Sequence, residues 1–136
     1  MDFIHVRCLE PDRWDRVALR AFAGPRSVDY RGLAVAVEAL ARTLRDADVG
    51  RGARVALLAQ ASAEFVVGLL AALRCGAAVA PIDPSLRGLS LTDALDRLAP
   101  DALIGVDSIL RRAVASGVQV DRTRAVIAFR EATSNP

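Results

Sequence analysis

The stretch RVALLAQASAEFVVGLLAALRCGAAVAPIDP, residues 54–84, decides the fold of this 136-residue chain. It opens with the apolar run 54–59, which predicts a strand buried on both faces. Ser62 suits the N-cap of a helix, because its hydroxyl can accept a backbone hydrogen bond from the first turn. The side chains predicted to form the buried stripe of that helix have helical spacing: Val66, Leu69, Leu70 and Leu73.

A second strand follows this helix. Gly76 stands where the end of a helix requires a left-handed backbone. The apolar residues 77–80 predict a short buried strand, which Pro81 is expected to end. A strand, a helix and a strand in this order form a unit with two parallel strands, because the crossover needs a long connection.

The same alternation continues toward the C-terminus. Helical spacing predicts helices over residues 89–98 and 108–115, with Asp107 capping the second. Short apolar runs predict strands at residues 102–106 and 125–129.

The N-terminal side is predicted to add a strand from Trp14 to Ala23, a turn at Gly24-Pro25 and an extended segment at 27–29. Asp29 is placed to cap a helix that stops near Asp48. Its inward side chains are expected to be Leu33, Val37, Leu40 and Leu44. Its solvent face is expected to carry Arg31, Glu38, Arg42 and Arg45.

Together these elements predict an α/β fold of three layers, a mostly parallel sheet with helices on both faces, as in a flavodoxin-like subdomain. Residues 1–136 are expected to form one domain, with 130–136 as a loose tail. Ligands usually bind beyond the carboxyl ends of such strands, here residues 60–62, 81–83 and 106–107.

Composition excludes several classes of function. The net charge is +2, and basic and acidic residues alternate without runs, so no nucleic-acid partner is expected. Apolar stretches are too short for a membrane span, and no signal-peptide pattern opens the chain, so a cytoplasmic protein without a membrane partner is predicted. His5, Cys8 and Cys75 are too few and too scattered for a metal site or a disulfide framework.

Four segments carry a family resemblance: SVDYRGL at 27–33, DVGRGARVAL at 48–57, SAEF at 62–65 and LRCGAAVAPIDP at 73–84. They resemble L-(T/S)-Y-x-E-L, G-V-x-x-G-D-R-V-A-L, N-S-x-E-F and L-K-A-G-A-x-x-x-P-(L/I)-D-P of the adenylate-forming superfamily. That superfamily includes acyl-CoA synthetases, fatty-acyl-AMP ligases and peptide-synthetase adenylation domains. The chain departs from the pattern at Gly32, Asp48, Ala53, Arg74 and Cys75.

The resemblance implies framework roles for the matching residues, and it assigns no catalytic, cofactor-binding or metal-binding residue to this chain. The matching positions are Tyr30, Leu33, Gly52, Arg54, Glu64, Phe65, Gly76, Pro81, Asp83 and Pro84. Residues 82–85 and 100–105 also look like the branch that handles long-chain acyl groups and forms β-lactones, which implies fatty-acid or polyketide metabolism.

The implied reaction joins a carboxylate to ATP, giving acyl-AMP and pyrophosphate, and then passes the acyl group to CoA, a carrier-protein thiol or an internal alkoxide. The superfamily holds ATP and Mg²⁺ with a loop read as T-S-G-T-T-G-x-P-K-G and uses a catalytic Lys. This sequence has no such run, and its 18 basic residues are all Arg. The chain alone is therefore expected to bind no cofactor and to be inactive, as a scaffold that pairs with the remainder of a ligase.

Two alternatives stay open, and so does the question whether the chain itself is an enzyme. It could be a stand-alone truncated homologue that binds another protein or forms a homodimer. It could also be a small flavodoxin-like nucleotide or flavin binder, although no glycine-rich first turn supports that interpretation.

Three side chains allow both a functional and a structural interpretation. Asp83 could line a ligand cleft, but fixing a turn is favoured. Cys75 could be a nucleophile, but no His or Lys stands near it in the sequence, so packing is favoured. Trp14 suits an interface anchor or the edge of a core.

Overall fold

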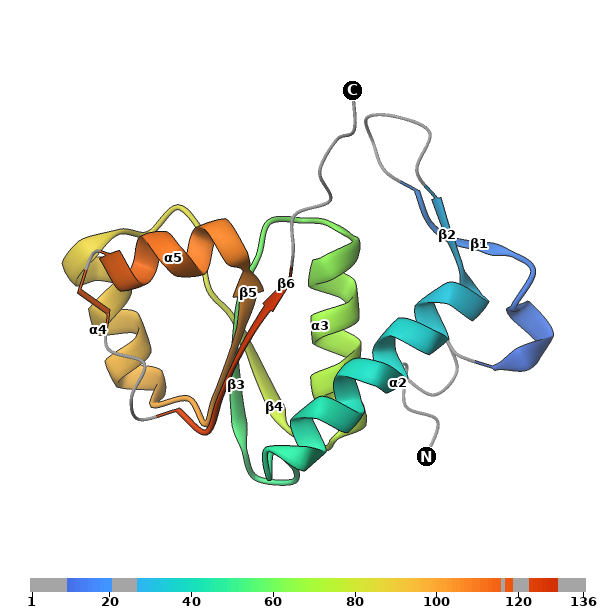
Figure 1. Cartoon of the computed structure of the whole chain (residues 1–136), viewed down its shortest axis with the longest axis horizontal. Coiled ribbons are helices and arrows are strands. Elements are labelled where there is room, and N and C mark those ends of the chain that lie inside the picture. Colours follow the sequence, from blue (N-terminus) through green and yellow to red (C-terminus); the bar gives the residue numbers. More distant parts are fainter. Residues whose placement is uncertain (1–9, 21–26, 116, 119–122, 130–136) are drawn as a thin grey trace.

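The computed structural model describes residues 10–20, 27–115, 117–118 and 123–129 (Figure 1). The N-terminal elements are the 3₁₀ helix η1 (Pro11–Arg13), β1 (Val17–Arg20), β2 (Ser27–Asp29) and α2 (Tyr30–Asp46). The elements that follow are β3 (Arg54–Leu58), α3 (Ala63–Arg74), β4 (Ala78–Pro81), α4 (Gly88–Leu98), β5 (Ala102–Val106), α5 (Asp107–Ala115) and β6 (Ala125–Phe129). Within these ranges no helix has the length and apolar content that a membrane crossing requires.

The main sheet is parallel and has the strand order β4-β3-β5-β6. Val55 in the central strand β3 pairs with Val79 of β4 on one side and with Ala102 of β5 on the other. The chain thus adds β4 on one side of β3 and then crosses over to add β5 on the other side, as in flavodoxin-like sheets. β1 and β2 form a separate antiparallel pair.

Helices cover both faces of this sheet, so the predicted three-layer α/β fold is confirmed. Leu57 and Ile104 point to one side, where they pack with Leu44 of α2 and with α3. Leu58 and Leu103 point to the other side and pack against α4 and α5. Figure 1 shows the two helix pairs on opposite sides of the strands. The alternation follows from the two-residue period of a strand.

The predicted strand over residues 14–23 is wrong at its start. Pro11 opens the 3₁₀ helix η1, whose end Trp14 closes by donating its backbone N–H to the Pro11 carbonyl at 3.2 Å. A proline at the first position of a helix is favoured because its ring presets φ. The strand starts only at Val17, and the predicted turn at Gly24-Pro25 lies outside the described residues.

The predicted buried stripe of α3 is also wrong for three of its four members. Leu70 is buried, whereas Val66, Leu69 and Leu73 are only partly buried. A Cβ atom added at Gly68 would lie 2.9 Å from Leu57 Cδ1. The helix thus approaches the sheet through its smallest residues, which turns the bulkier ones toward its flanks.

β4 is an edge strand with half-exposed residues, not the buried strand that was predicted. Pro81 belongs to the strand as its last residue and pairs with Leu57, instead of standing beyond the strand end. An edge strand tolerates proline when the missing N–H would have faced away from the sheet.

Each of the four described α-helices is followed by a left-handed residue: Asp48 after α2, Gly76 after α3, Ala99 after α4 and Gly117 after α5. At the end of α3, Gly76 has φ +83°, and the N–H groups of Gly76 and Ala77 donate to the carbonyls of Leu73 and Ala72 at 3.0 and 3.1 Å. This double hydrogen bond defines a Schellman motif and confirms the predicted role of Gly76.

The end of α2 repeats the motif with an aspartate. Asp48 has φ +61°, and the N–H groups of Asp48 and Val49 donate to the carbonyls of Arg45 and Leu44, both at 2.9 Å. Asp48 therefore stands where glycine is least strained, and it is also where the chain departs from the Gly-Val of the superfamily pattern.

We expect Asp48→Gly to stabilise the chain by about 0.5–1 kcal/mol. Relief of the left-handed strain outweighs the larger entropy of glycine in the unfolded chain. The carboxylate that is lost is 99% exposed and lies 3.9 Å from Arg124, so its removal costs little. Urea midpoints measure the effect, with Gly76→Asp as the reverse control; a midpoint that falls in Asp48→Gly would contradict the assignment.

Candidate functional site

The sequence predicts that ligands bind at the carboxyl edge of the sheet, in the loops that follow the strands. The first of these loops leads from β3 into α3. Ser62 Oγ donates to the Gln60 carbonyl at 2.8 Å and accepts from the Phe65 N–H at 3.2 Å. The hydroxyl thus donates one hydrogen bond and accepts another at the start of α3, which confirms Ser62 as the N-cap of this helix.

The second loop follows β4 and is fixed by Asp83. Its Oδ1 accepts from the backbone N–H of Ser85 at 2.9 Å and from the Ser85 hydroxyl at 2.7 Å. The Leu86 N–H donates to the Asp83 carbonyl at 3.2 Å. The hydroxyl bond, and after it the backbone bond, lower the pKa of Asp83. The structure thus agrees with the turn-fixing interpretation of Asp83.

The third loop is replaced by a helix that starts at once. Asp107 is the first residue of α5, and its Oδ2 lies 2.9 Å from Arg111 Nε one turn later. The polar side chains of the carboxyl edge therefore bond within their own segments. The glycines with positive φ are separated along the chain: Gly52, Gly76 and Gly117 stand in turns, and Gly88 is the first residue of α4. Within the described residues these glycines do not come together in one phosphate-binding loop.

The opposite, amino edge of the sheet carries the denser set of polar contacts. The backbone N–H of Arg54 donates to Asp101 Oδ2 at 2.9 Å, and the Asp101 N–H donates back to the Arg54 carbonyl at 2.8 Å. The Arg54 guanidinium donates to the carbonyl of Leu98, the last residue of α4, at 3.0 Å. A cation is favourable there because helix carbonyls at a C-terminus carry partial negative charge.

Arg124 binds the turn that follows α2. Its guanidinium donates to the Asp48 carbonyl at 2.9 Å, and its backbone N–H donates to the Asp101 carbonyl at 2.7 Å. We call Asp48, Arg54, Asp101 and Arg124 the amino-edge cluster. The sequence interpretation missed Asp101 and Arg124; the available signal was a charged residue directly before each of the two apolar runs that became β5 and β6.

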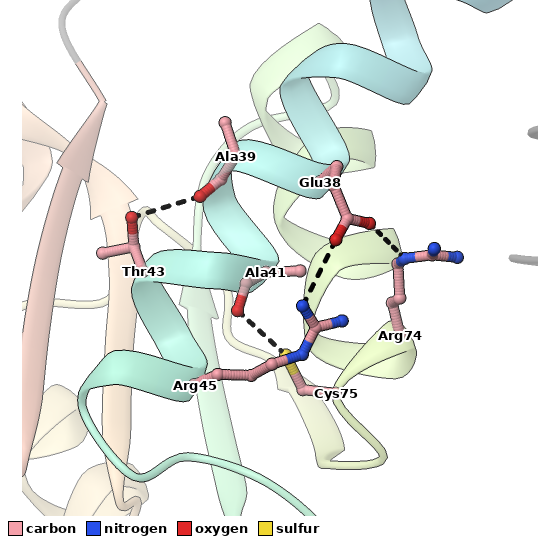
Figure 2. A network of polar contacts seen from close by, with 7 residues as sticks. All are labelled: Glu38, Ala39, Ala41, Thr43, Arg45, Arg74 and Cys75. Carbon is pink, nitrogen blue, oxygen red and sulfur yellow. Dashed lines mark hydrogen bonds and ion pairs between the residues drawn. The ribbon is translucent and has the colours of Figure 1, made fainter.

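A second polar network joins α2 to α3 (Figure 2). The Glu38 carboxylate accepts from Arg45 on its own helix at 3.2 Å and from Arg74 on α3. Glu38 therefore connects two helices, while both Glu38 and Arg45 lie on the polar face of α2 that the sequence predicted. The Arg45 hydrogen bond is the strongest influence and lowers the pKa of Glu38; burial opposes it, and Arg74 adds to the lowering.

Cys75 lies beside this network, at the end of α3. Its thiol donates to the Ala41 carbonyl at 3.4 Å (Figure 2). Burial is the main influence on this group and raises the pKa of the Cys75 thiol. A neutral thiol is a poor nucleophile, so the structure supports packing as the role of Cys75.

We expect Glu38→Gln to lower stability at pH 7 by no more than about 1 kcal/mol, because the three side chains are 35–47% exposed. Since folding lowers the pKa of Glu38, its contribution is present above the unfolded value near 4.5 and is lost as pH falls through the folded value. The gap between the urea midpoints of wild type and variant should therefore narrow as the pH is lowered below 4.5. A gap that does not narrow, or one matched by the exposed control Arg42→Gln, would rule out the pairing.

The other residues of the family motifs also have framework positions. Tyr30 opens α2 and donates its backbone N–H to the Arg16 carbonyl at 2.9 Å, and Leu33 is 2% exposed in the core. Glu64 stands in the first turn of α3, and Phe65 packs at the edge of the core. The remaining positions lie at turns or strand ends: Gly52, Pro81 and Pro84. The structure distributes these residues over both edges of the sheet and does not gather them into one site.

The fold is thus that of a doubly wound α/β protein, and the motif residues make contacts within its framework. The chain belongs to the AMP-binding enzyme family, whose family model matches residues 10–135.

Relatives of known activity match only in part. The chain is 32% identical over 80 residues to an olefin β-lactone synthetase of Stenotrophomonas maltophilia, which is 59% of this chain and 14% of that protein. It is 44% identical over 70 residues to the hybrid PKS-NRPS synthetase mycA of Thermothelomyces thermophilus, 52% of this chain and 2% of that protein. The chain therefore spans a small fraction of these relatives.

Solved structures also match most of this chain but only a small part of their own length. NpsA of Klebsiella oxytoca superposes with a TM-score of 0.69 at 27% identity, over 86% of this chain and 22% of NpsA. The anthranilate CoA ligase AuaEII superposes with a TM-score of 0.80 at 21% identity, over 92% of this chain and 24% of the ligase. At 21% identity, the similarity to AuaEII is one of fold.

Proposed function

We propose that this chain is the amino-terminal scaffold segment of an ATP-dependent, acyl-adenylate-forming ligase and is inactive by itself. One observation carries the proposal: the polar residues of the family motifs are used for internal contacts. Arg54 holds the end of α4, Asp83 holds the turn after β4, and Ser62 holds the start of α3. Such residues position a sheet for a partner that supplies the chemistry.

The reaction of the whole ligase would join a carboxylate to ATP and release pyrophosphate, before the acyl group moves to CoA, a carrier-protein thiol or an internal alkoxide. Attack on the α-phosphate needs cationic or hydrogen-bonding groups aimed at the developing charge. We assign those groups, with ATP and Mg²⁺, to the remainder of the ligase. One matching relative is a hybrid PKS-NRPS synthetase, which favours a role in polyketide metabolism; fatty-acid metabolism stays the other proposed role.

A chimera tests the scaffold role. Residues 10–135 replace the matching segment of Klebsiella oxytoca NpsA, and ATP–pyrophosphate exchange is measured with the acid that NpsA uses. We expect exchange with the acid preference of NpsA unchanged, because a scaffold does not select the acid. NpsA lacking its own segment is the control. A changed acid preference, or a folded chimera without exchange, would contradict the proposal.

A second candidate, a stand-alone homologue that binds a partner or pairs with itself, is favoured by one observation. Val126 on β6 is 46% exposed, which is unusual for a strand of apolar residues. Light scattering separates the two candidates: a discrete dimer of the isolated chain supports the second, and a monomer counts against self-pairing.

A further inference from the structure

The helices α2 and α4 lie on opposite faces of the sheet, but both end at its amino edge, because each leads into a parallel strand (Figure 1). Leu44 in the last turn of α2 belongs to the core on one face, and Leu95 in the last turn of α4 belongs to the core on the other. Each end is followed by a left-handed residue other than glycine, Asp48 with φ +61° and Ala99 with φ +48°. Such a backbone is strained and persists only where neighbouring groups hold it.

An arginine from the start of another strand holds each of these ends. Arg54 opens β3, the strand that follows α2, and its guanidinium donates to the Leu98 carbonyl of α4 at 3.0 Å. Arg124 stands directly before β6, and its guanidinium donates to the Asp48 carbonyl after α2 at 2.9 Å. The two contacts therefore bind carbonyls at or next to the two strained residues.

Asp101 joins the two arginines. Its Oδ2 accepts from the Arg54 N–H at 2.9 Å, and its Oδ1 lies 3.9 Å from the Arg124 guanidinium. Its carbonyl accepts from the Arg124 N–H at 2.7 Å. Only two residues separate Asp101 from Leu98 in the chain, and one of them is a proline with a fixed φ. A continuous chain of contacts thus runs from the turn after α2, through Arg124, Asp101 and Arg54, to the end of α4.

We propose that the amino-edge cluster couples the two helix layers energetically, with Asp101 as the positioning residue that transmits the coupling. When the end of α4 opens, Arg54 loses its acceptor and Asp101 is displaced, so Arg124 holds the end of α2 less firmly. The reverse also applies, because a coupling free energy is reciprocal. A partner that binds one helix layer would therefore change the stability of the other. This coupling is a property of the fold and does not depend on the proposed function.

Amide hydrogen exchange followed by NMR measures the opening of each helix end separately. The Val49 N–H reports on α2, since it donates to the Leu44 carbonyl at 2.9 Å. The Ala99 N–H reports on α4, since it donates to the Leu95 carbonyl at 2.8 Å. The Ile82 N–H is the reference for opening elsewhere, because it is hydrogen-bonded to β3 at the carboxyl edge.

We expect Arg54→Ala to speed exchange at Ala99 and also, at least about twofold, at Val49 on the opposite face. Arg124→Ala should have the reciprocal effect on Ala99. Exchange at Ile82 should stay unchanged in both variants. When Asp101 is replaced by alanine as well, each arginine substitution should affect only its own helix end.

Arg74→Gln is the matched control, because it removes an ion pair of α2 with α3 outside the amino-edge cluster. It should leave exchange at Ala99 unchanged. If Asp101→Ala is too unstable for exchange measurements, the double variant of Arg54 and Arg124 gives the same test: its effect should be smaller than the product of the two single effects. Effects confined to one helix end, a cross-effect that persists without Asp101, an equal rise at Ile82, or single effects that multiply in the double variant would each overturn the proposal.

Discussion

Replacing Gly105 by alanine is expected to destabilise the chain by about 1–3 kcal/mol, the cost of overpacking a core. A Cβ atom at Gly105 would lie 2.8 Å from the Leu58 carbonyl oxygen and 3.0 Å from Leu110 Cγ. The first neighbour is the backbone of the paired strand β3, and the second is a buried side chain of α5. Neither can withdraw, because a helix and a strand would have to move with it.

Thermal unfolding followed by circular dichroism measures this loss, at about 4 °C of Tm per kcal/mol for a chain of this size. Gly50→Ala is the matched control: the nearest atom to its added Cβ is 3.8 Å away, and its φ is not in the left-handed range. We expect Gly50→Ala to leave Tm nearly unchanged. Equal effects of the two substitutions would show that the spacing of β3, β5 and α5 is not as described.

Asp101→Ala is expected to have the second large effect, a loss of about 1–2 kcal/mol. Its carboxylate accepts the backbone N–H that starts the central strand, and without it the N–H of Arg54 has lost its acceptor. Hydrogen bonds to charged groups contribute about 1.5–3 kcal/mol when buried, and we take less because the Asp101 side chain is 31% exposed.

Asp101→Asn separates the hydrogen bond from the charge. The amide oxygen can still accept from Arg54, while the weaker attraction to Arg124 across 3.9 Å is lost. We therefore expect Asn to retain more than half of the stability that Ala loses, measured as urea midpoints. If Asn and Ala destabilise equally, charge and not the hydrogen bond to Arg54 is what holds the amino-edge cluster together.

The central sheet could be predicted from the sequence because its strands are buried runs with clear ends. The runs at 102–106 and 125–129 became β5 and β6 without change, and the run at 54–59 became β3 less its last residue. The capping residues Asp29 and Ser62 were also predictable, since a cap bonds only three residues along the chain. Signals of this kind are local, and the sequence contains them in full.

What could not be predicted depends on contacts between distant segments. Whether residues 77–80 are buried depends on their position at the edge of the sheet. The sequence of a single strand does not determine the order of the strands. The orientation of α3 follows from the close approach of Gly68 to Leu57. Hydrophobic periodicity alone does not predict this contact. The amino-edge cluster joins residues as far apart as Asp48 and Arg124, so its members looked like unrelated surface charges.

Several residues of the family motifs make contacts within the framework. Gly76 ends a helix, Asp83 fixes a turn, and Arg54 ties β3 to α4 and β5. Each therefore has a sufficient structural reason for its identity. Departures from the family pattern have local consequences too: Asp48 adopts a strained backbone, and Arg74 pairs with Glu38.

ATP–pyrophosphate exchange by the purified chain alone tests the scaffold account most directly. With ATP, Mg²⁺ and a panel of acids that spans short, aromatic and long-chain carboxylates, we predict no exchange above a protein-free blank. Sustained exchange that follows the chain through purification and depends on one of the acids would contradict the account.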